Sequence, residues 1–297
     1  MEITNSKYTY VKKIESGSFA TVYKAILKSN RMEQFAIKIN KKPAINEIKM
    51  LKQSEGKYVV KCFEDFITEE SKHIIVMEYC PLDLFSFLDY GIGKKITLEE
   101  TRHIWWQIAT GIKHLHDLGI IHRDVKPENI LISSNGDCKL ADFGFARELY
   151  NDKLLETVFG TVAYNAPEKL YGLSNYDYKV DTWSMGMTFA NLYADDDIIK
   201  STNSKEAIKV LERIFGKSKV RQAIDPNLTC SETTANLKVF KKIPRVARAL
   251  VLELLECNRI KRLSAEQCLS HKFFSGQRNP PIRHIKKILE LKEKSNQ

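Results

Sequence analysis

The chain has 297 residues, with 47 Lys and Arg against 37 Asp and Glu, and a formal net charge of +10. This length allows one large domain or two lobes around a substantial core. The first ten residues lack the apolar core of a signal peptide, and no apolar run approaches the length of a membrane span. We therefore expect an intracellular protein, cytoplasmic, nuclear or both.

The cysteines and the basic residues argue against two classes of protein. The six cysteines are scattered and form no C-x-x-C pair, which disfavours both a zinc site and a disulfide framework. The basic residues are spread along the chain without a groove-reading motif. This favours a solvated basic surface over nucleic-acid binding.

Strand patterns predominate from Tyr8 to about Tyr79. Only residues 44–53 have helical spacing, with apolar side chains at positions 45, 48 and 51. We predict a small antiparallel sheet with one helix. The expected strands lie at 10–14, 21–25, 35–39, 59–67 and 73–79.

From about Leu84 the periodicity becomes helical. A long helix is predicted over 98–118, preceded by a capping box of Thr97 and Glu100 and ended by Gly119. Further helices are predicted around 181–194, 205–216, 244–256 and 264–270. The lobe boundary falls near Pro81, which breaks the last strand pattern, and a cleft between two lobes is a natural ligand site.

A turn signal, Asn135-Gly136, separates the apolar runs 130–132 and 138–141. A two-residue hairpin turn is expected there. Such a turn would pair Asn129 with Asp142, with Asp124 just upstream. Amide and carboxylate oxygens suit Mg²⁺. An ordinary polar hairpin end would explain any one of these residues, but not all of them with Lys126 alongside.

Two features of the predicted sheet favour phosphate binding. Gly17, with small residues beside it, would let backbone N–H groups approach a phosphate, although an ordinary hairpin turn is an alternative. Lys38 lies within an apolar strand and, if buried, needs an anionic partner. Glu47 on the following helix is the nearest candidate; a lysine that extends along the surface is the alternative.

These motifs occur in the order found in eukaryotic protein kinases, which the chain resembles from roughly Tyr10 to Phe274. Residues 35–38 resemble the strand-three lysine motif, 122–129 the catalytic loop, and 142–144 the metal-binding Asp-Phe-Gly motif. Residues 166–168 resemble the Ala-Pro-Glu end of the activation segment, and 181–186 the start of the central helix.

The resemblance implies an α+β, bilobal protein-kinase-like fold over residues 8–274. An N-terminal antiparallel β-sheet lobe with one helix (about 8–79) should join a larger, mainly α-helical C-terminal lobe (about 84–274) through a hinge at about 78–83. The basic tail, 275–297, has a helical apolar stripe. A helix packed on the C-lobe or a frayed terminus is favoured over a calmodulin-type target or an autoinhibitory segment.

The resemblance further implies a serine/threonine protein kinase that uses ATP and Mg²⁺ and acts on protein substrates. Asp124 should accept the proton of the substrate hydroxyl, and Lys126 should neutralise the γ-phosphate. Asn129 and Asp142 should hold Mg²⁺. Lys126, together with Thr161, marks serine/threonine rather than tyrosine specificity.

ATP is expected to bind between the glycine loop and the hinge. Lys38, fixed by Glu47, should hold the α- and β-phosphates. Met77 should lie at the back of the adenine pocket, residues 78–80 should bind adenine, and Asp83 should reach the ribose. The expected ATP-binding residues are Ile14, Glu15, Ser16, Gly17, Ser18, Phe19, Ala20, Thr21, Val22, Ala36, Lys38, Glu47, Met77, Glu78, Cys80 and Asp83.

Structural and regulatory roles also follow from the resemblance. Arg262 should pair with Glu168, and Asp181 should begin the central helix. Arg123 precedes Asp124, as in kinases controlled by activation-loop phosphorylation. A phosphate on Thr157 would pair with Arg123 and order the loop; otherwise Thr157 is an ordinary loop residue.

The chain departs from the family pattern in three places. The glycine loop keeps one glycine of three, with Glu15 and Ala20 at the other positions. This supports the alternative of a pseudokinase or scaffold, whereas the intact catalytic and metal-binding motifs support an active enzyme. The linker from Lys38 to Glu47 is short, so the N-lobe helix should lack its first turn.

Asn165 replaces the arginine expected before Ala-Pro-Glu in cyclin-dependent kinases, although residues 44–48 faintly resemble their cyclin-binding helix. The subfamily therefore stays open. A regulatory protein could bind the N-lobe helix or the C-terminal tail. No membrane or nucleic-acid partner is expected.

Overall fold

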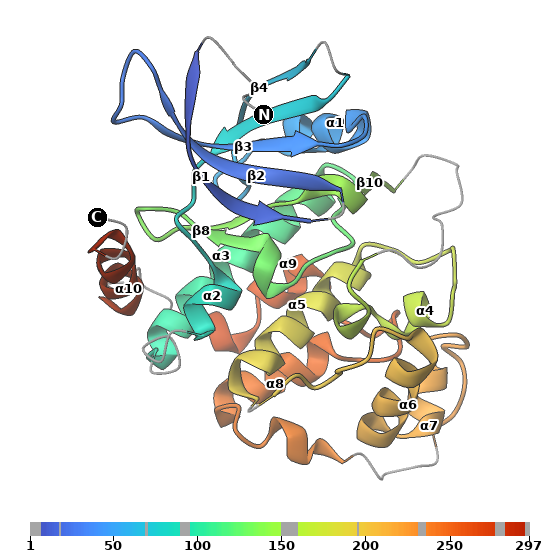
Figure 1. Cartoon of the computed structure of the whole chain (residues 1–297). Coiled ribbons are helices and arrows are strands. Elements are labelled where there is room, and N and C mark those ends of the chain that lie inside the picture. Colours follow the sequence, from blue (N-terminus) through green and yellow to red (C-terminus); the bar gives the residue numbers. More distant parts are fainter. Residues whose placement is uncertain are drawn as a thin grey trace.

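The computed structural model describes residues 7–17, 19–68, 71–89, 96–149, 160–194, 196–230, 236–276 and 283–294. The chain forms a sheet lobe above a larger helical lobe (Figure 1). This confirms the predicted bilobal α+β fold. None of the helices in these ranges is both long enough and apolar enough to cross a membrane.

The N-terminal lobe is a five-stranded antiparallel sheet in the order β1-β2-β3-β5-β4. Its elements are β1 (Tyr8–Ser16), β2 (Ala20–Leu27), β3 (Gln34–Asn40), α1 (Ile45–Gln53), β4 (Cys62–Ile67) and β5 (His73–Glu78). The helix α1 is short, as the short linker predicted.

Residues 58–60 correct one predicted boundary. A sheet strand was expected to begin at Val59, but β4 begins only at Cys62. Instead the N–H group of Val60 donates to Leu140 O at 2.9 Å, and that of Leu140 donates to Tyr58 O at 2.9 Å. This segment therefore joins the sheet lobe to the helical lobe rather than extending the sheet.

Side-chain alternation along β3 explains how a lysine comes to face the junction of the lobes. Ile37 and Ile39 are buried in the core of the sheet lobe. Because successive side chains in a strand point to opposite faces, Ala36 and Lys38 lie on the other face, where α1 and the helical lobe pack.

The C-terminal lobe is built around the buried helices α3 and α5. The predicted capping box of Thr97 and Glu100 is present at the start of α3. In chain order the elements are β6 (Leu82–Asp83), α2 (Leu84–Asp89), α3 (Leu98–Asp117), β7 (Ile120–Ile121), η2 (Pro127–Asn129), β8 (Ile130–Ile132), β9 (Cys138–Leu140), η3 (Phe143–Phe145), β10 (Arg147–Glu148), η4 (Val162–Tyr164), α4 (Pro167–Leu170), α5 (Lys179–Tyr193), α6 (Ser204–Phe215), α7 (Lys217–Arg221), η5 (Leu237–Phe240), α8 (Arg245–Leu254), α9 (Ala265–Leu269), η6 (Lys272–Phe274) and α10 (Arg283–Lys294).

The β8–β9 hairpin forms with a register one residue away from the predicted one. Ile132 pairs with Cys138, and Ser133 N donates to Asp137 O at 3.0 Å. The loop therefore has three residues. Gly136, at φ 87°, takes the left-handed position that such loops require. The hydroxyl of Ser133 accepts from Asp137 N at 3.1 Å, which stabilises the longer loop.

This shift changes what faces Asn129. Ala141 N donates to Asn129 O at 2.9 Å, so Ala141, not Asp142, is the strand neighbour of Asn129. The predicted cross-strand pairing of Asn129 with Asp142 is wrong. Both residues still leave the open end of the hairpin, but their side chains are oriented by other contacts.

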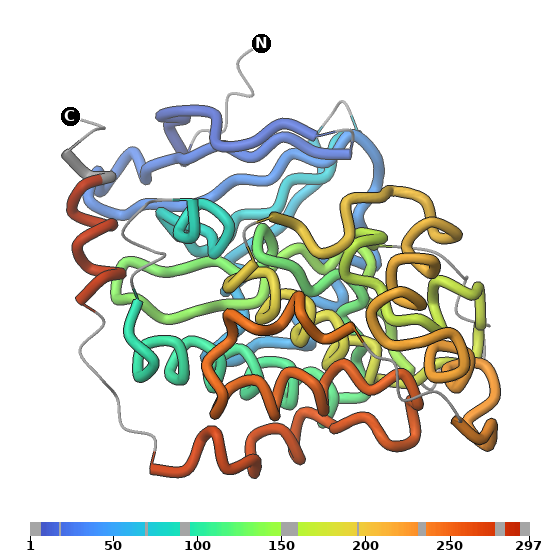
Figure 2. The backbone as a smooth tube through the Cα atoms, turned by 90° about the horizontal axis from the view of Figure 1, so that it is seen from below, coloured from blue at the N-terminus to red at the C-terminus, as the bar shows by residue number. Residues whose placement is uncertain are grey.

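The tail helix α10 is packed against the fold, at the periphery of the molecule (Figures 1 and 2). Ile285, Ile288 and Leu289 are buried in the large core. His284 donates its backbone N–H to Glu100 Oε1 at 3.0 Å, and its Nδ1 lies 2.7 Å from Glu100 Oε2. The described part of the tail is therefore a helix that contacts the start of α3 in the C-lobe.

We expect Ile288→Ala to lower the free energy of unfolding by about 2–5 kcal/mol, because Ile288 is fully buried and the substitution leaves a cavity. Lys287→Ala, on the exposed face of the same helix, should change it by less than about 0.5 kcal/mol. Urea denaturation measures both. Equal stabilities for the two variants would show that α10 does not contribute to the fold.

Candidate active site

Lys38 connects the two lobes at their junction. Its ammonium donates to Glu47 Oε1 on α1 at 2.5 Å and to Asp142 Oδ1 at 2.9 Å. The first contact was expected from the sequence; the second was not. Lys38 and Glu47 are largely buried, whereas the side chain of Asp142 is 42% exposed.

Two carboxylates sharing one ammonium determine the electrostatics of this cluster. Burial disfavours the charged form of Lys38, but attraction to Asp142 and Glu47 outweighs it and raises the pKa of Lys38 above its usual value. Burial also opposes ionisation of Asp142, yet Lys38 holds the pKa of Asp142 below its usual range. Lys38 and Asp142 are therefore both charged at neutral pH.

The helix α1 is held against the segment that follows Asp142. Asn46 Nδ2 donates to Ala146 O at 3.0 Å, and Lys49 forms an ion pair with Glu148 at 2.8 Å. Directly before the helix, Ala44 N donates to Nδ1 of His73, on β5, at 3.1 Å. These contacts place Glu47 within reach of Lys38 despite the short helix.

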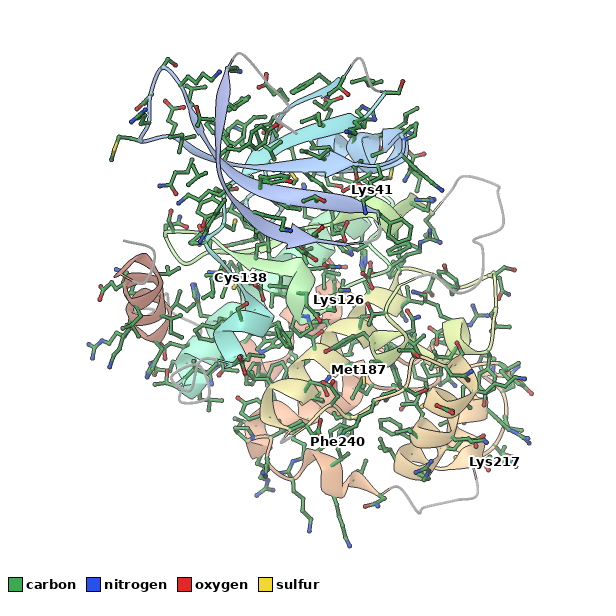
Figure 3. All side chains as sticks on the ribbon, in the orientation of Figure 1. Lys41, Lys126, Cys138, Met187, Lys217 and Phe240 are labelled. Atoms are coloured by element: carbon green, nitrogen blue, oxygen red, sulfur yellow. The ribbon has the colours of Figure 1, made fainter. Side chains whose placement is uncertain are left out.

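Asp124 lies at the centre of a second cluster and is 4% exposed. Its Oδ1 accepts from Thr161 N at 2.7 Å and from Thr161 Oγ1 at 3.0 Å. Lys126 Nζ donates to Thr161 Oγ1 at 2.9 Å and lies 3.5 Å from Asp124 Oδ2. The structure thus brings together the predicted base, the predicted γ-phosphate lysine and Thr161. Figure 3 shows Lys126 in the helical lobe, below Lys41 of the sheet lobe.

The side chain of Asn129 is oriented by Asp124. Its Nδ2 donates to Asp124 O at 2.8 Å and to Asp124 Oδ2 at 2.9 Å. Both bonds use the amide nitrogen, so the amide oxygen is turned away from Asp124. An amide oxygen and the partly exposed carboxylate of Asp142 form an all-oxygen donor set that fits Mg²⁺.

Protein groups alone do not complete a metal site here. Within the described ranges, no three His, Cys, Asp or Glu side chains gather in a way that could hold a metal ion. Mg²⁺ commonly binds through one or two protein ligands together with substrate phosphates. The residues present therefore fit a cation that arrives with a nucleotide.

Asp181, at the start of α5, holds the backbone before Asp124. It is fully buried and accepts from His122 N at 2.9 Å and from Arg123 N at 2.8 Å. His116 Nε2 lies 3.0 Å from Oδ2 of Asp181, the same oxygen that accepts from His122 N. Burial opposes ionisation, but hydrogen bonding and attraction from His116 hold the pKa of Asp181 below its usual range. Sequence reasoning missed His116, because nothing in its local pattern indicates this partner.

Two non-glycine residues of the site have a left-handed backbone. Arg123 has φ 69° and Asp142 has φ 61°, a conformation that is unfavourable for residues with a Cβ. Arg123 precedes Asp124, the predicted base, and Asp142 is itself a predicted ligand of the metal ion. Packing of Phe143 on His122, with ring centroids 5.0 Å apart, ties the two strained turns together.

The glycine loop is a β1–β2 hairpin closed by a bond from Gly17 N to Ala20 O at 2.9 Å. Lys41 Nζ donates to Gly17 O at 2.9 Å. A Cβ at Gly17 would meet nothing closer than Ala20 O at 3.9 Å, so the fold itself does not require glycine there. Of the other predicted loop residues, Ile14, Glu15 and Ser16 end β1, and Thr21 and Val22 follow Ala20 in β2. Phe19 lies in the turn between the two strands, and Ser18 lies outside the described residues.

The predicted adenine pocket falls on β3, β5 and the hinge. Met77 pairs with Ala36 across the two strands. Glu78 ends β5, and its carboxylate forms an ion pair with Lys139 at 2.9 Å. Burial raises the pKa of the Cys80 thiol to about 12, so the thiol is protonated at neutral pH.

The ribose prediction for Asp83 is not tested by its contacts. Its two carboxylate oxygens accept from Ser86 N and Ser86 Oγ, each at 2.7 Å. Asp83 thus caps the start of α2, and ribose binding stays a prediction.

Thr157 lies outside the described residues. Arg123 donates through Nε to Phe145 O at 2.7 Å and through Nη1 to Tyr176 at 3.1 Å.

Glu168 and Arg262 form the expected pair. Two parallel bonds of 2.6 and 2.9 Å join the guanidinium to the carboxylate, and both side chains are fully buried. The guanidinium also lies over the ring of Trp183 at 5.0 Å. This bidentate pair fixes α4 against the lower part of the helical lobe.

A buried lysine that sequence reasoning missed follows Glu168. Lys169 is 1% exposed and donates to Arg123 O at 2.9 Å and to Asn165 Oδ1 at 2.6 Å. Burial, only partly offset by attraction to Asp181, lowers the pKa of Lys169 to about 8. Lys169 directly follows the Ala-Pro-Glu motif, and nothing in the surrounding sequence predicts that its side chain is buried.

The folded-state pKa of Lys169 lies below its ordinary value, so between these two values the unfolded chain binds the proton more tightly. Stability from this group should therefore rise as the pH increases through about 8. We expect the stability of the wild type relative to Lys169→Met to rise by about 2 kcal/mol between pH 7 and pH 10. Urea denaturation at both pH values measures it; a pH-independent difference would contradict the prediction.

Comparisons with known proteins agree with this geometry. The family model described as "Protein kinase domain" matches residues 8–274. A solved structure of the CAK complex from Chaetomium thermophilum bound to ATP-gamma-S contains a chain that superposes with a TM-score of 0.79. The alignment covers 93% of both chains at 24% identity, a likeness that supports the fold alone. By the match to its family model, the chain belongs to the protein kinase family.

Proposed function

We propose that this protein is an active serine/threonine protein kinase that transfers the γ-phosphate of ATP to protein substrates. The observation that carries the proposal is the cluster of Asp124, Lys126 and Thr161, held together by bonds of 2.7 to 3.0 Å. It places a carboxylate and an ammonium side by side next to Asn129. A general base and a phosphate-neutralising cation are both needed at the reacting atoms.

The transfer step follows from these positions. Asp124 accepts the proton of the substrate hydroxyl, whose oxygen forms a bond to the γ-phosphorus. The bond from that phosphorus to the β–γ bridging oxygen breaks, and ADP leaves with the electron pair. Lys126 stabilises the negative charge on the γ-phosphoryl oxygens.

The sheet lobe supplies the nucleotide contacts in this proposal. Lys38, charged and held by Glu47, binds the α- and β-phosphates. Gly17 allows the backbone of the glycine loop to approach them, which agrees with the open space at its Cβ position. Asn129 and Asp142 would hold Mg²⁺, which when bound neutralises phosphate charge. The related complex is described as bound to ATP-gamma-S, which supports ATP as the donor.

Regulation is proposed at two places. A phosphate on Thr157 would pair with Arg123 and order the activation segment. A partner protein would bind at the N-lobe helix, where Ile45 is 69% exposed. The similar chain was solved as part of the CAK complex, which supports the binding of a partner. The tail helix offers less apolar surface to a partner, because Ile285, Ile288 and Leu289 are buried in the core, although Leu291 is 43% exposed.

The decisive assay incubates the chain with Mg²⁺, radiolabelled ATP and a peptide library, followed by phosphoamino-acid analysis. We expect label on Ser and Thr. Asp124→Asn should lower the turnover number about 10²–10⁴-fold with little change in ATP affinity. Asp117→Asn, which removes an exposed carboxylate at the end of α3, should leave turnover unchanged.

Two results would contradict this proposal. Label on tyrosine would overturn the serine/threonine specificity. Labelling no greater in the wild type than in Asp124→Asn would favour the pseudokinase or scaffold alternative.

A further inference from the structure

Lys169 lies beneath the catalytic loop and has no part in the chemistry described above. It belongs to the four-residue helix α4 and is almost fully buried. Its ammonium donates to one backbone carbonyl, Arg123 O, and to one side-chain amide oxygen, Asn165 Oδ1. A lysine is rarely buried to this extent unless its ammonium is hydrogen-bonded.

The carbonyl that Lys169 contacts belongs to the peptide bond between Arg123 and Asp124. On the other side of the same residue, Arg123 N donates to Asp181 Oδ1 at 2.8 Å. Arg123 is therefore held at both its N–H and its C=O group while its φ is 69°. Because these bonds set the peptide plane that leads into Asp124, they also set the direction of the Asp124 side chain.

The same carbonyl faces the segment that ends the activation loop. A Cβ at Gly160 would stand 2.5 Å from Arg123 O, and Gly160 has φ 86°. The next residue, Thr161, donates to Asp124 Oδ1. Asn165, the second partner of Lys169, ends this segment. One ammonium thus contacts both the catalytic loop and the segment that packs on it.

We propose that Lys169 is a positioning residue for phosphoryl transfer, which holds Asp124 in register with the segment 160–165 through Arg123 O and Asn165. This inference rests on the proposed kinase activity. It also accounts for Asn165, where cyclin-dependent kinases are expected to have arginine. An arginine at this position would place a second cation against the Lys169 ammonium, whereas the amide oxygen accepts its hydrogen bond.

The charges around Lys169 agree with this role. Asp181, Asp124 and Glu168 favour its ammonium form, whereas Arg123 opposes it and burial opposes it most. An apolar side chain would avoid this burial penalty. What the ammonium provides, against this burial penalty, is an oriented donor to Arg123 O.

The experiment compares Lys169→Met with Thr182→Val. Thr182 is a matched control, because its buried hydroxyl also lies within hydrogen-bond distance of two acceptors, Lys179 O and Leu263 O, each at 2.9 Å. Neither acceptor belongs to the catalytic loop. Each variant is assayed at saturating peptide for turnover number and for the KM of ATP, with urea denaturation to measure the folded fraction. Lys169→Arg tests rescue by a side chain that keeps the charge and the N–H donors.

We expect Lys169→Met to fold, to keep its KM for ATP within twofold, and to lose at least tenfold in turnover number. Thr182→Val should stay within twofold of the wild type in turnover, and Lys169→Arg should recover part of the loss. Turnover of Lys169→Met within twofold of the wild type, or a loss explained by its unfolded fraction, would overturn the inference. A wild type no more active than Asp124→Asn would instead refute the proposed function on which it rests.

Discussion

The geometry of the two lobes depends on one ammonium group shared by two carboxylates. Lys38 projects from the sheet lobe and meets Glu47 of α1 and Asp142 of the helical lobe. Removing one partner of a buried ion pair typically costs about 3–5 kcal/mol, so α1 cannot carry Glu47 away from Lys38 without a large penalty. The contact of Lys38 with the partly exposed Asp142 contributes less. The bond from Asn46 to Ala146 closes this arrangement into a ring. The position of α1 is therefore coupled to the segment that follows Asp142.

The helical lobe meets a different requirement, which is to hold strained backbone in place. Arg123 and Asp142 both have positive φ values, and such turns persist only where their surroundings determine them. Asp181 and Lys169 hold the peptide groups on either side of Arg123. Asp181 belongs to the buried helix α5 and is in turn contacted by His116 of α3. The backbone that leads into the proposed base is consequently held on both sides of Arg123.

Much of this arrangement was predictable where the signal is local. Periodicity gave the strands of the sheet and the long helix α3, and the need of a buried cation for an anion indicated the pairing of Lys38 with Glu47. The β8–β9 register was missed by one residue, because the hydroxyl of Ser133 stabilises a three-residue loop. The contact of Lys38 with Asp142 and the roles of His116 and Lys169 depend on how distant segments pack. A single sequence does not indicate which polar side chain is buried beneath a distant loop.

The central claim is that Lys38 and Asp142 form one binding site for a nucleotide and its cation. Isothermal titration calorimetry of the wild type and Asp142→Asn with ATP, each with and without Mg²⁺, tests it most directly. Two carboxylates outnumber the single ammonium, so ATP alone should bind weakly, and Mg²⁺ should increase its affinity at least tenfold. Asp142→Asn should lose most of that increase while still binding ATP. Equal affinity of the wild type for ATP with and without Mg²⁺ would contradict the claim.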